Sequence, residues 1–219
     1  MARIYDRKNK TFYEDKQYGG KALNFLYGNI LGRIILRLFI AGKGYSRLNA
    51  KRNSTRKSTE KIAPFVKEYG IVMSDFEDRE YSSFSDFFTR KLADGKRVFS
   101  AEKNDLISVA DSKLLCYRIT DDGKIPIKNS IYTAREIIDE DLTTDFYGGY
   151  CLVFRLTVDD YHRYCFFDDG KLIRSKYING KLHTVSPISS KKYKVFSENF
   201  RSVSYIETEN FGTCYQIEI

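Results

Sequence analysis

The sequence has few residues that bind metals or form cross-links. It contains two histidines and four cysteines without C-x-x-C spacing; the cysteines are Cys116, Cys151, Cys165 and Cys214. A structural zinc site needs clustered thiolate or imidazole ligands, so the sequence predicts no metal centre. The N-terminus shows no signal-peptide pattern, and we therefore expect reduced thiols in a cytosolic protein.

Proline is also scarce, with 3 in 219 residues, whereas aromatic residues make up 15% of the chain. This balance favours a sheet-rich core, and 42% apolar residues are typical of a globular chain. We predict an α+β protein in two parts. Residues 1–57 should form an amphipathic, membrane-associating segment, and residues 58–219 a mainly antiparallel β-rich body that is incomplete at its C-terminal end.

Negative charge is rare in the first quarter of the chain. Residues 1–57 contain 14 Lys and Arg but only 3 Asp and Glu, a net charge of +11. The remaining residues contain 23 Lys and Arg and 26 Asp and Glu, a net charge of −3. This segregation predicts a polyanionic partner, which is either a membrane surface or a nucleic acid.

Apolar residues repeat at helical spacing from Leu23 to Phe39, which predicts one continuous amphipathic helix. It is too short, and with Arg33 and Arg37 too charged, to span a bilayer comfortably, so we expect it to lie among lipid headgroups. The basic run Lys43–Lys57 would add attraction to anionic lipids. One alternative is a helix packed on the protein's own core beside a solvated linker. Another is a nucleic-acid-binding arm, although the apolar stripe fits a bilayer better.

Capping residues and alternating patterns predict the elements of the body. Helices are expected at Ser58–Gly70, Ser83–Leu92 and Thr133–Asp139. Strands are expected at Ile107–Ala110, Leu114–Ile119, Ile125–Ile127, Tyr150–Leu156, Tyr164–Phe167, Lys171–Tyr177, Val195–Phe196, Ser202–Thr208 and Thr213–Ile219. No turn or cap follows the last strand, and we expect the native core to continue beyond it.

Both histidines lie in the segment Val158–Pro187. The Asn179-Gly180 dipeptide is a strong hairpin signal, and a hairpin there would bring His183 back towards His162. Two imidazoles held together can serve as an acid/base pair near neutral pH. The alternative is two unrelated histidines, one packed in the core and one on the surface.

Motifs in this chain resemble those of the phosphatidylserine decarboxylases. The most specific is DYHRYCF at Asp160–Phe166, and GKLHTVSP at Gly180–Pro187 is similar to the clostridial-type branch. FFTRKLADGKRVF at Phe87–Phe99 resembles the family's aromatic–Arg–Leu–Gly–Arg signature, although Lys91 and Val98 replace its usual prolines. VADSKLL at Val109–Leu115 resembles the Ala-Asp-Gly/Ser element. NFGTCYQIEI at Asn210–Ile219 looks like the strand that precedes the serine-bearing part of the family.

The resemblance implies a proenzyme that cuts itself before a serine, converts this serine to a pyruvoyl group, and decarboxylates phosphatidylserine to phosphatidylethanolamine. Asp111 and His162 resemble the family's aspartate and first histidine, which implies an oriented base and a proton donor. Where much of the family has a second histidine, this chain has Cys165, which is a poor base at neutral pH unless its pKa is strongly shifted. His183 is the only other imidazole, so we expect it to take the missing role, with Asp111, His162 and His183 converging on one pocket.

The sequence lacks the family's cleavage motif, because none of its 14 glycines precedes a serine. We therefore expect a truncated proenzyme that resembles most of the family's β chain and cannot form the pyruvoyl cofactor from its own residues. The expected partners are an anionic membrane surface, phosphatidylserine and a pyruvoyl-bearing α chain, with no nucleic acid. The expected location is peripheral, at the cytoplasmic face of the cell membrane. The alternative is a non-catalytic fragment that binds lipid surfaces.

Overall fold

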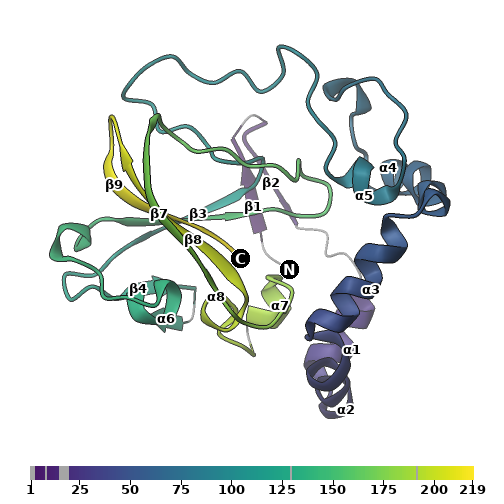
Figure 1. Ribbon diagram of the computed structural model, residues 1–219, viewed down its shortest axis with the longest axis horizontal. Helices are drawn as coiled ribbons and strands as arrows, with labels where there is room; N and C mark the ends of the chain where they lie inside the picture. The colour runs from purple at the N-terminus through teal and green to yellow at the C-terminus, as the bar shows by residue number, and fades with distance from the viewer. Residues whose placement is uncertain (1–2, 8, 15–19, 129, 191) are drawn as a thin grey trace.

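A computed structural model of the chain confirms an α+β fold with antiparallel sheets. It describes residues 3–7, 9–14, 20–128, 130–190 and 192–219. The largest sheet has the strand order β7–β8–β9, formed by Gly170–Ile178, Arg201–Thr208 and Gly212–Glu218 (Figure 1). A tight turn joins β8 to β9, and Gly212 fits it because its φ of 72° lies in the left-handed region.

Two smaller antiparallel pairs complete the sheets of the body. Strand β3 (Lys113–Arg118) pairs with β6 (Tyr150–Arg155), and β4 (Ile125–Ile127) pairs with β5 (Ser130–Tyr132). The alternating apolar pattern predicted three of these strands within one or two residues of their ends.

Helix α6 (Ala134–Ile138) closes the core of the body. The Thr133 side chain accepts a hydrogen bond from the backbone of Glu136, and the Glu136 carboxylate accepts one from the backbone of Thr133. This capping box confirms the short helix predicted at Thr133. The buried cluster that α6 forms with the residues beneath it consists of Ile119, Ile125, Ile127, Tyr132, Ala134, Ile137, Ile138 and Val203.

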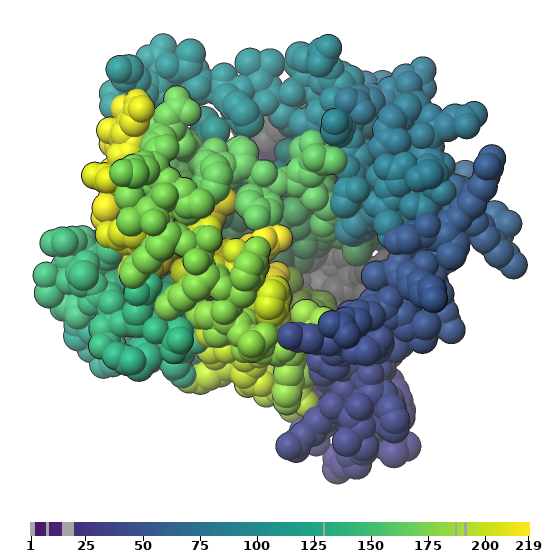
Figure 2. All heavy atoms as spheres, viewed as in Figure 1, coloured from purple at the N-terminus to yellow at the C-terminus, as the bar shows by residue number. Residues whose placement is uncertain are grey.

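The N-terminal quarter contains a two-stranded hairpin and a series of helices. They are β1 (Arg3–Asp6), β2 (Thr11–Glu14), α1 (Gly20–Gly28), α2 (Ile30–Ile35), the π-helical turn η1 (Leu36–Ile40) and α3 (Lys43–Asn53). Figures 1 and 2 show α1, α2 and α3 as an arm at the lower right of the molecule. The basic run after Lys43 is therefore largely helical rather than a linker.

The prediction of one continuous helix from Leu23 to Phe39 is wrong. The helix breaks at Asn29, whose side chain caps α2 by accepting a hydrogen bond from the backbone of Leu31 at 2.8 Å. The two parts meet at 92°. At the bend, a Cβ on Gly32 would lie 2.1 Å from the carbonyl oxygen of Phe25, so only glycine fits. Within the described ranges, no single helix is long and apolar enough for a membrane span, although the bent pair meets that test jointly.

A helical segment connects the arm to the body. It consists of the 3-10 helix η2 (Arg56–Lys61), α4 (Ile62–Tyr69), the 3-10 turn η3 (Met73–Asp75) and α5 (Phe84–Phe88). Gly70 ends α4 in the left-handed conformation, with φ 64°, which confirms the predicted stop. Ser83 caps α5 as predicted, by accepting a hydrogen bond from the backbone of Asp86 at 3.1 Å, but α5 ends at Phe88 rather than at Leu92.

The segments Ile107–Ala110 and Tyr164–Phe167 are loops, and the strands predicted there are wrong. The backbone N–H of Cys165 donates to the carbonyl of Val109 at 2.9 Å, so the two loops bind each other instead of joining a sheet. Both are apolar enough to resemble strands, but their partners come from distant parts of the chain, which periodicity does not reveal.

Two further predictions around His183 are also wrong. Asn179-Gly180 does not form a hairpin. After β7 the chain runs on to α7 (Pro187–Ser190), and the strand that pairs with β7 is β8, which comes later in the chain. The predicted strand Val195–Phe196 is the start of α8 (Val195–Glu198). A run of two apolar residues is too short to distinguish a strand from a helical turn.

Candidate active site

His162 lies in the loop between β6 and β7, stacked on the ring of Phe88 at a centroid distance of 4.0 Å. Its Nε2 is 3.0 Å from the carbonyl oxygen of Thr157. A carbonyl oxygen only accepts hydrogen bonds, so Nε2 carries a proton and Nδ1 is the nitrogen that can exchange one. Burial lowers the pKa of His162, while the Thr157 carbonyl opposes this shift. At neutral pH the imidazole is therefore mainly uncharged.

An ion pair fixes the turn that holds His162. The Asp160 carboxylate accepts a hydrogen bond from the backbone N–H of Thr157 at 2.6 Å and from Lys113 Nζ at 2.7 Å. The side chains of Lys113 and Asp160 are only 14% and 16% exposed. Because the carbonyl of Thr157 also orients His162, Lys113 and Asp160 act on His162 through this turn.

Asp111 is held by a cation rather than by a histidine. Arg97 Nε donates to the Asp111 carboxylate at 2.9 Å, and Arg97 Nη1 donates to Asp75 at 3.1 Å. Among the described residues, no hydrogen bond joins Asp111 to either histidine. Arg97 itself has a left-handed backbone, with φ 55°, which is uncommon for a residue with a side chain.

Cys165 lies beside the loop that carries Asp111. Its backbone N–H donates to the carbonyl of Val109 at 2.9 Å, and its own carbonyl accepts from Gln216 Nε2 at 3.3 Å. Burial raises the pKa of the Cys165 thiol, so the group stays protonated at neutral pH. Cys165 thus occupies the place next to the aspartate loop without supplying a base there.

The last strand reaches the His162 loop. Tyr164 Oη donates to the carboxylate of Glu218, near the end of β9, at 2.8 Å. Together with the Gln216 contact, this bond brings three segments to one place: the end of β9, the loop of His162, and the loop of Asp111.

His183 lies in a different environment, where helix α1 meets the body. It is 5% exposed and stacks on Tyr193 at a centroid distance of 4.5 Å, with Tyr27 Oη 3.4 Å from its Nδ1. Asn199 fixes the backbone of His183 through two hydrogen bonds, at 3.1 and 2.7 Å. Burial lowers the pKa of His183, and its Nε2 finds no partner among the described residues. The structure therefore does not join His183 to Asp111 or His162 by hydrogen bonds, and these surroundings are those of a packed core histidine.

Sequence reasoning missed Lys113, Asp160 and Phe88 as residues of the site. All three lie inside motifs that carry the family resemblance, which was the available signal. Their roles depend on contacts with residues distant in sequence, such as the bond between Lys113 and Asp160 across 47 positions.

Comparison with known proteins identifies the same family. The family model for phosphatidylserine decarboxylase matches residues 84–219. The chain is 57% identical over 217 residues to phosphatidylserine decarboxylase proenzyme 2 of Clostridium acetobutylicum, covering 99% of this chain and 75% of that protein. It is 35% and 36% identical, each over 224 residues, to the phosphatidylserine decarboxylase proenzymes of Ruminiclostridium cellulolyticum and Clostridium tetani, covering 100% of this chain and 75% of each relative. The chain therefore belongs to the phosphatidylserine decarboxylase family of carboxy-lyases.

Proposed function

We propose that this chain decarboxylates phosphatidylserine to phosphatidylethanolamine with a pyruvoyl group, and that His162 relays the proton that replaces carbon dioxide. Nδ1 first accepts the proton that the substrate's ammonium group must lose before its amine can react, and then donates it to the carbon that has lost carbon dioxide. The observation that carries the proposal is the hydrogen bond between His162 Nε2 and Thr157, at 3.0 Å, which leaves Nδ1 to exchange protons. The family match and the meeting of three segments at this loop support it.

The loop of Asp111, which is hydrogen-bonded to the loop of His162, offers a group that suits a pyruvoyl carbonyl. Ser112, next to Asp111, has a buried Oγ with no partner in the described part of the chain, so a hydroxyl donor is available to an incoming carbonyl oxygen. When bound, a pyruvoyl group withdraws electrons from the substrate as carbon dioxide leaves. The group must come from a serine that these 219 residues do not supply in a Gly-Ser motif.

In this proposal Asp111, held by Arg97, serves the self-cleavage of the proenzyme. In self-cleavage, a serine hydroxyl needs a base, and a carboxylate can orient or replace an imidazole in that role. Arg97 Nε positions the Asp111 carboxylate by donating to it at 2.9 Å. We therefore assign Asp111 to self-cleavage and His162 to decarboxylation, and we keep the participation of His183 as a hypothesis for mutagenesis.

A chimeric protein tests the proposed function. It consists of the whole chain followed, after Ile219, by the quarter of the 57% identical relative that this chain does not match, where the family resemblance predicts the Gly-Ser motif. We expect self-cleavage into two chains, visible by mass spectrometry, and release of labelled carbon dioxide from phosphatidylserine. Asp111→Asn should block cleavage. A chimera that cleaves itself but releases no carbon dioxide would contradict the proposed function.

We also propose that the arm binds an anionic membrane surface, which places the protein peripherally at the cytoplasmic face of the cell membrane. Large apolar side chains on α1, α2 and η1 remain exposed, up to 70% for Ile30; they are Phe25, Ile30, Leu31, Ile34, Leu38 and Phe39. Among the described residues, Tyr27, Leu36 and Ala41 form a buried cluster, against which the partly buried Leu23, Leu26 and Ile40 pack. The adjacent helix α3 carries Lys43, Arg47, Lys51 and Arg52, which suits anionic headgroups.

Co-sedimentation with phosphatidylserine-containing vesicles tests this surface. The double variant Leu38→Glu, Phe39→Glu should lower the affinity at least about tenfold, because each apolar side chain contributes roughly 1.5–3 kcal/mol when buried. Ile131→Glu, at a body residue of similar exposure, is the matched control. Binding should also weaken with salt. Vesicle binding by a chimera without any decarboxylation would favour the alternative, a non-catalytic lipid-binding protein.

A further inference from the structure

Arg90 follows α5 and is the largest fully buried side chain among the described residues, with 1% exposure. Its guanidinium lies over the rings of Phe76 and Phe87, at 4.1 and 4.9 Å from their centroids. The described residues place no carboxylate within ion-pair distance of it. Its Nε has no hydrogen-bond partner among them, and its Nη1 reaches the Phe87 carbonyl only at 3.5 Å. Burying a cation in this way is costly unless an anion compensates for it.

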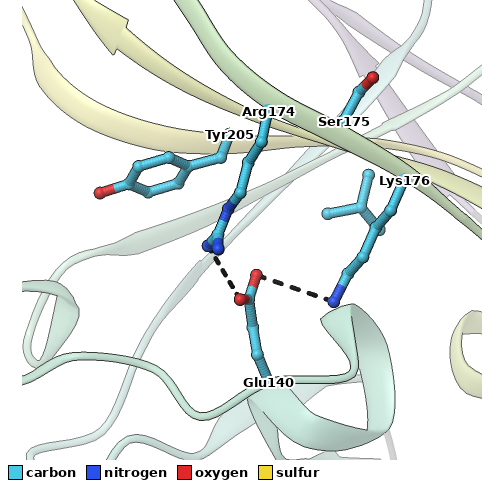
Figure 3. Close-up of a pocket in the computed structure, with 6 residues that line it drawn as sticks. Glu140, Arg174, Ser175, Lys176 and Tyr205 are labelled. Atoms are coloured by element: carbon cyan, nitrogen blue, oxygen red, sulfur yellow. Dashed lines mark ion pairs between the residues drawn. The ribbon is translucent and has the colours of Figure 1, made fainter.

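Another cationic cluster of the body has its positive charges neutralised by a carboxylate. Arg174 and Lys176 of β7 line a cavity of about 30 Å³, and Glu140 bridges them at 2.8 and 4.0 Å (Figure 3). Arg174 also lies over the Tyr205 ring. These cations have their counter-ion and need no ligand, whereas Arg90 is both more buried and without a carboxylate.

A second unpartnered polar group lies beside Arg90. Tyr81 Oη is buried and has no hydrogen-bond partner in the described residues, and the Tyr81 ring packs edge-on against Phe87 at 5.5 Å. Tyr81 and Phe76 both line a solvent-open groove of about 480 Å³. The Phe76 ring, one of the two that cover the Arg90 guanidinium, is therefore also part of the groove wall. Two donors without acceptors, next to a groove, indicate a place for an anion.

Arg90 also interacts with the candidate active site. Phe76 packs against Tyr161 at 6.0 Å, and Tyr161 is the neighbour of His162 in sequence. Burial lowers the pKa of Arg90, which the charge of Asp111 partly opposes, and the charge of Arg90 adds to the lowering of the His162 pKa that burial causes. A ligand anion at Arg90 is thus within electrostatic range of the residues assigned to the reaction.

We propose that Arg90 Nε and Tyr81 Oη bind a phosphate-type anion that enters through this groove, with a phospholipid headgroup as its source. The choice of a lipid as the ligand rests on the proposed function, whereas the anion site itself does not. Arginine and phenol donors suit a phosphate better than they suit a neutral ligand.

The other residues of the groove favour a headgroup over bare phosphate. Glu77 and Asp78 line the groove together with Arg79, so its wall presents charges of both signs. Arg79 lies 3.7 Å from Glu77 and is also paired with Asp86 at 2.7 Å. Acidic side chains repel a simple anion but attract the ammonium group of phosphoserine or phosphoethanolamine.

Calorimetric titration of the purified chain tests the site without any turnover. The probes are glycerophosphoserine, glycerophosphoethanolamine and inorganic phosphate. We expect the two headgroups to bind at least about tenfold more tightly than phosphate. Arg90→Met should weaken headgroup binding about tenfold or more, and Tyr81→Phe about two- to tenfold, because hydrogen bonds to charged groups are the stronger ones. Arg118→Gln, at an arginine whose side chain is 69% exposed, is the matched control and should bind normally.

Thermal unfolding separates a ligand site from a structural arginine. Methionine replaces an uncompensated buried charge with apolar atoms, so Arg90→Met should unfold at the same or a higher temperature. A lower unfolding temperature with unchanged headgroup binding would overturn the proposal. Tyr81→Phe and Arg90→Lys keep the test valid if Arg90→Met fails to fold, and wild-type affinity in both would also overturn it. Binding of phosphate as tightly as the headgroups would contradict the lipid source. Loss of decarboxylation in the chimera with retained headgroup binding would contradict the proposed function alone.

Discussion

The regions around the two histidines resemble each other and yet prepare their imidazoles for different tasks. Each ring stacks on an aromatic side chain, Phe88 for His162 and Tyr193 for His183, and burial lowers the pKa of both. His162, however, donates to a carbonyl in a half-exposed loop beside an ion pair. His183 is 5% exposed and joins α1 to the body.

This difference shows that a depressed pKa alone does not identify a proton carrier. A carrier needs a nitrogen that substrate can reach and a partner that fixes the tautomer, and His162 has the fixed tautomer in a loop near other charged groups. His183 has a fixed backbone and close ring contacts, which are features of packing.

The largest expected effect is on activity. In the self-cleaving chimera, His162→Asn should lower the rate of decarboxylation by about 10²–10⁴-fold, the usual contribution of a positioned general acid. His183→Asn should lower it far less. Labelled carbon dioxide release, normalised to the fraction of cleaved chain, measures both. Equal losses in the two variants would remove the distinction between the histidines and restore the hypothesis that His183 is catalytic.

The second effect is on stability, where we expect replacement of His183 to have a larger effect than replacement of His162. His183→Ala leaves a cavity next to Tyr27 and Tyr193, so we expect a loss of about 2–3 kcal/mol in the free energy of unfolding. For a protein of this size, the unfolding temperature should fall by roughly 5–10 °C. His162→Ala should cost less, because its loop is half-exposed.

His183→Phe serves as the control for this stability effect. It keeps a ring against Tyr193 and removes the unpartnered Nε2. Most of the stability should therefore be retained, since the ring contributes through packing. A loss as large as that of His183→Ala would show instead that the imidazole nitrogens are required.

The third effect is a pH dependence shared by both regions. The pKa of each histidine is lower in the folded state than the value of about 6.5 in the unfolded chain. Between these values the unfolded state binds more protons, so stability falls as the pH drops below about 6.5 and is unaffected above it. Urea unfolding at pH 7.5 and pH 5 should show this loss, and replacing either histidine with Asn should reduce it. If both variants lose as much stability between pH 7.5 and pH 5 as the unaltered chain, the two histidines do not cause this pH dependence.

Short sequence patterns predicted the helices and strands whose ends are fixed by residues close to them in the chain. The cap at Thr133, the stop at Gly70 and the strand Arg201–Thr208 follow from capping, backbone and alternation rules. The break at Asn29 was missed because apolar spacing continues across it, while the bend depends on a side-chain cap and a close approach at Gly32.

The site shows the same division between local and distant information. Asp111, His162 and His183 were chosen from the sequence, but the residues that contact them were not. Arg97 reaches Asp111 across 14 positions, and Tyr27 reaches His183 across 156. No spacing rule relates residues so far apart, so these contacts emerge only once the chain is folded.

The smallest expected effect concerns the hydroxyl group of Tyr27, which lies where the arm meets His183. Its Oη is 3.4 Å from His183 Nδ1, a long hydrogen bond, while the ring is 1% exposed and well packed. Tyr27→Phe keeps the ring and removes only the hydroxyl, so we expect a loss of about 0.5–1.5 kcal/mol, measured by urea unfolding. Tyr193→Phe keeps the stack on His183 and is the matched control. If the two variants are equally stable, the hydrogen bond from Tyr27 to His183 adds nothing measurable to the free energy of unfolding. The arm is then held by its other contacts with the body, among them the apolar cluster of Tyr27, Leu36 and Ala41 and the backbone hydrogen bond from Leu182 to Ala41.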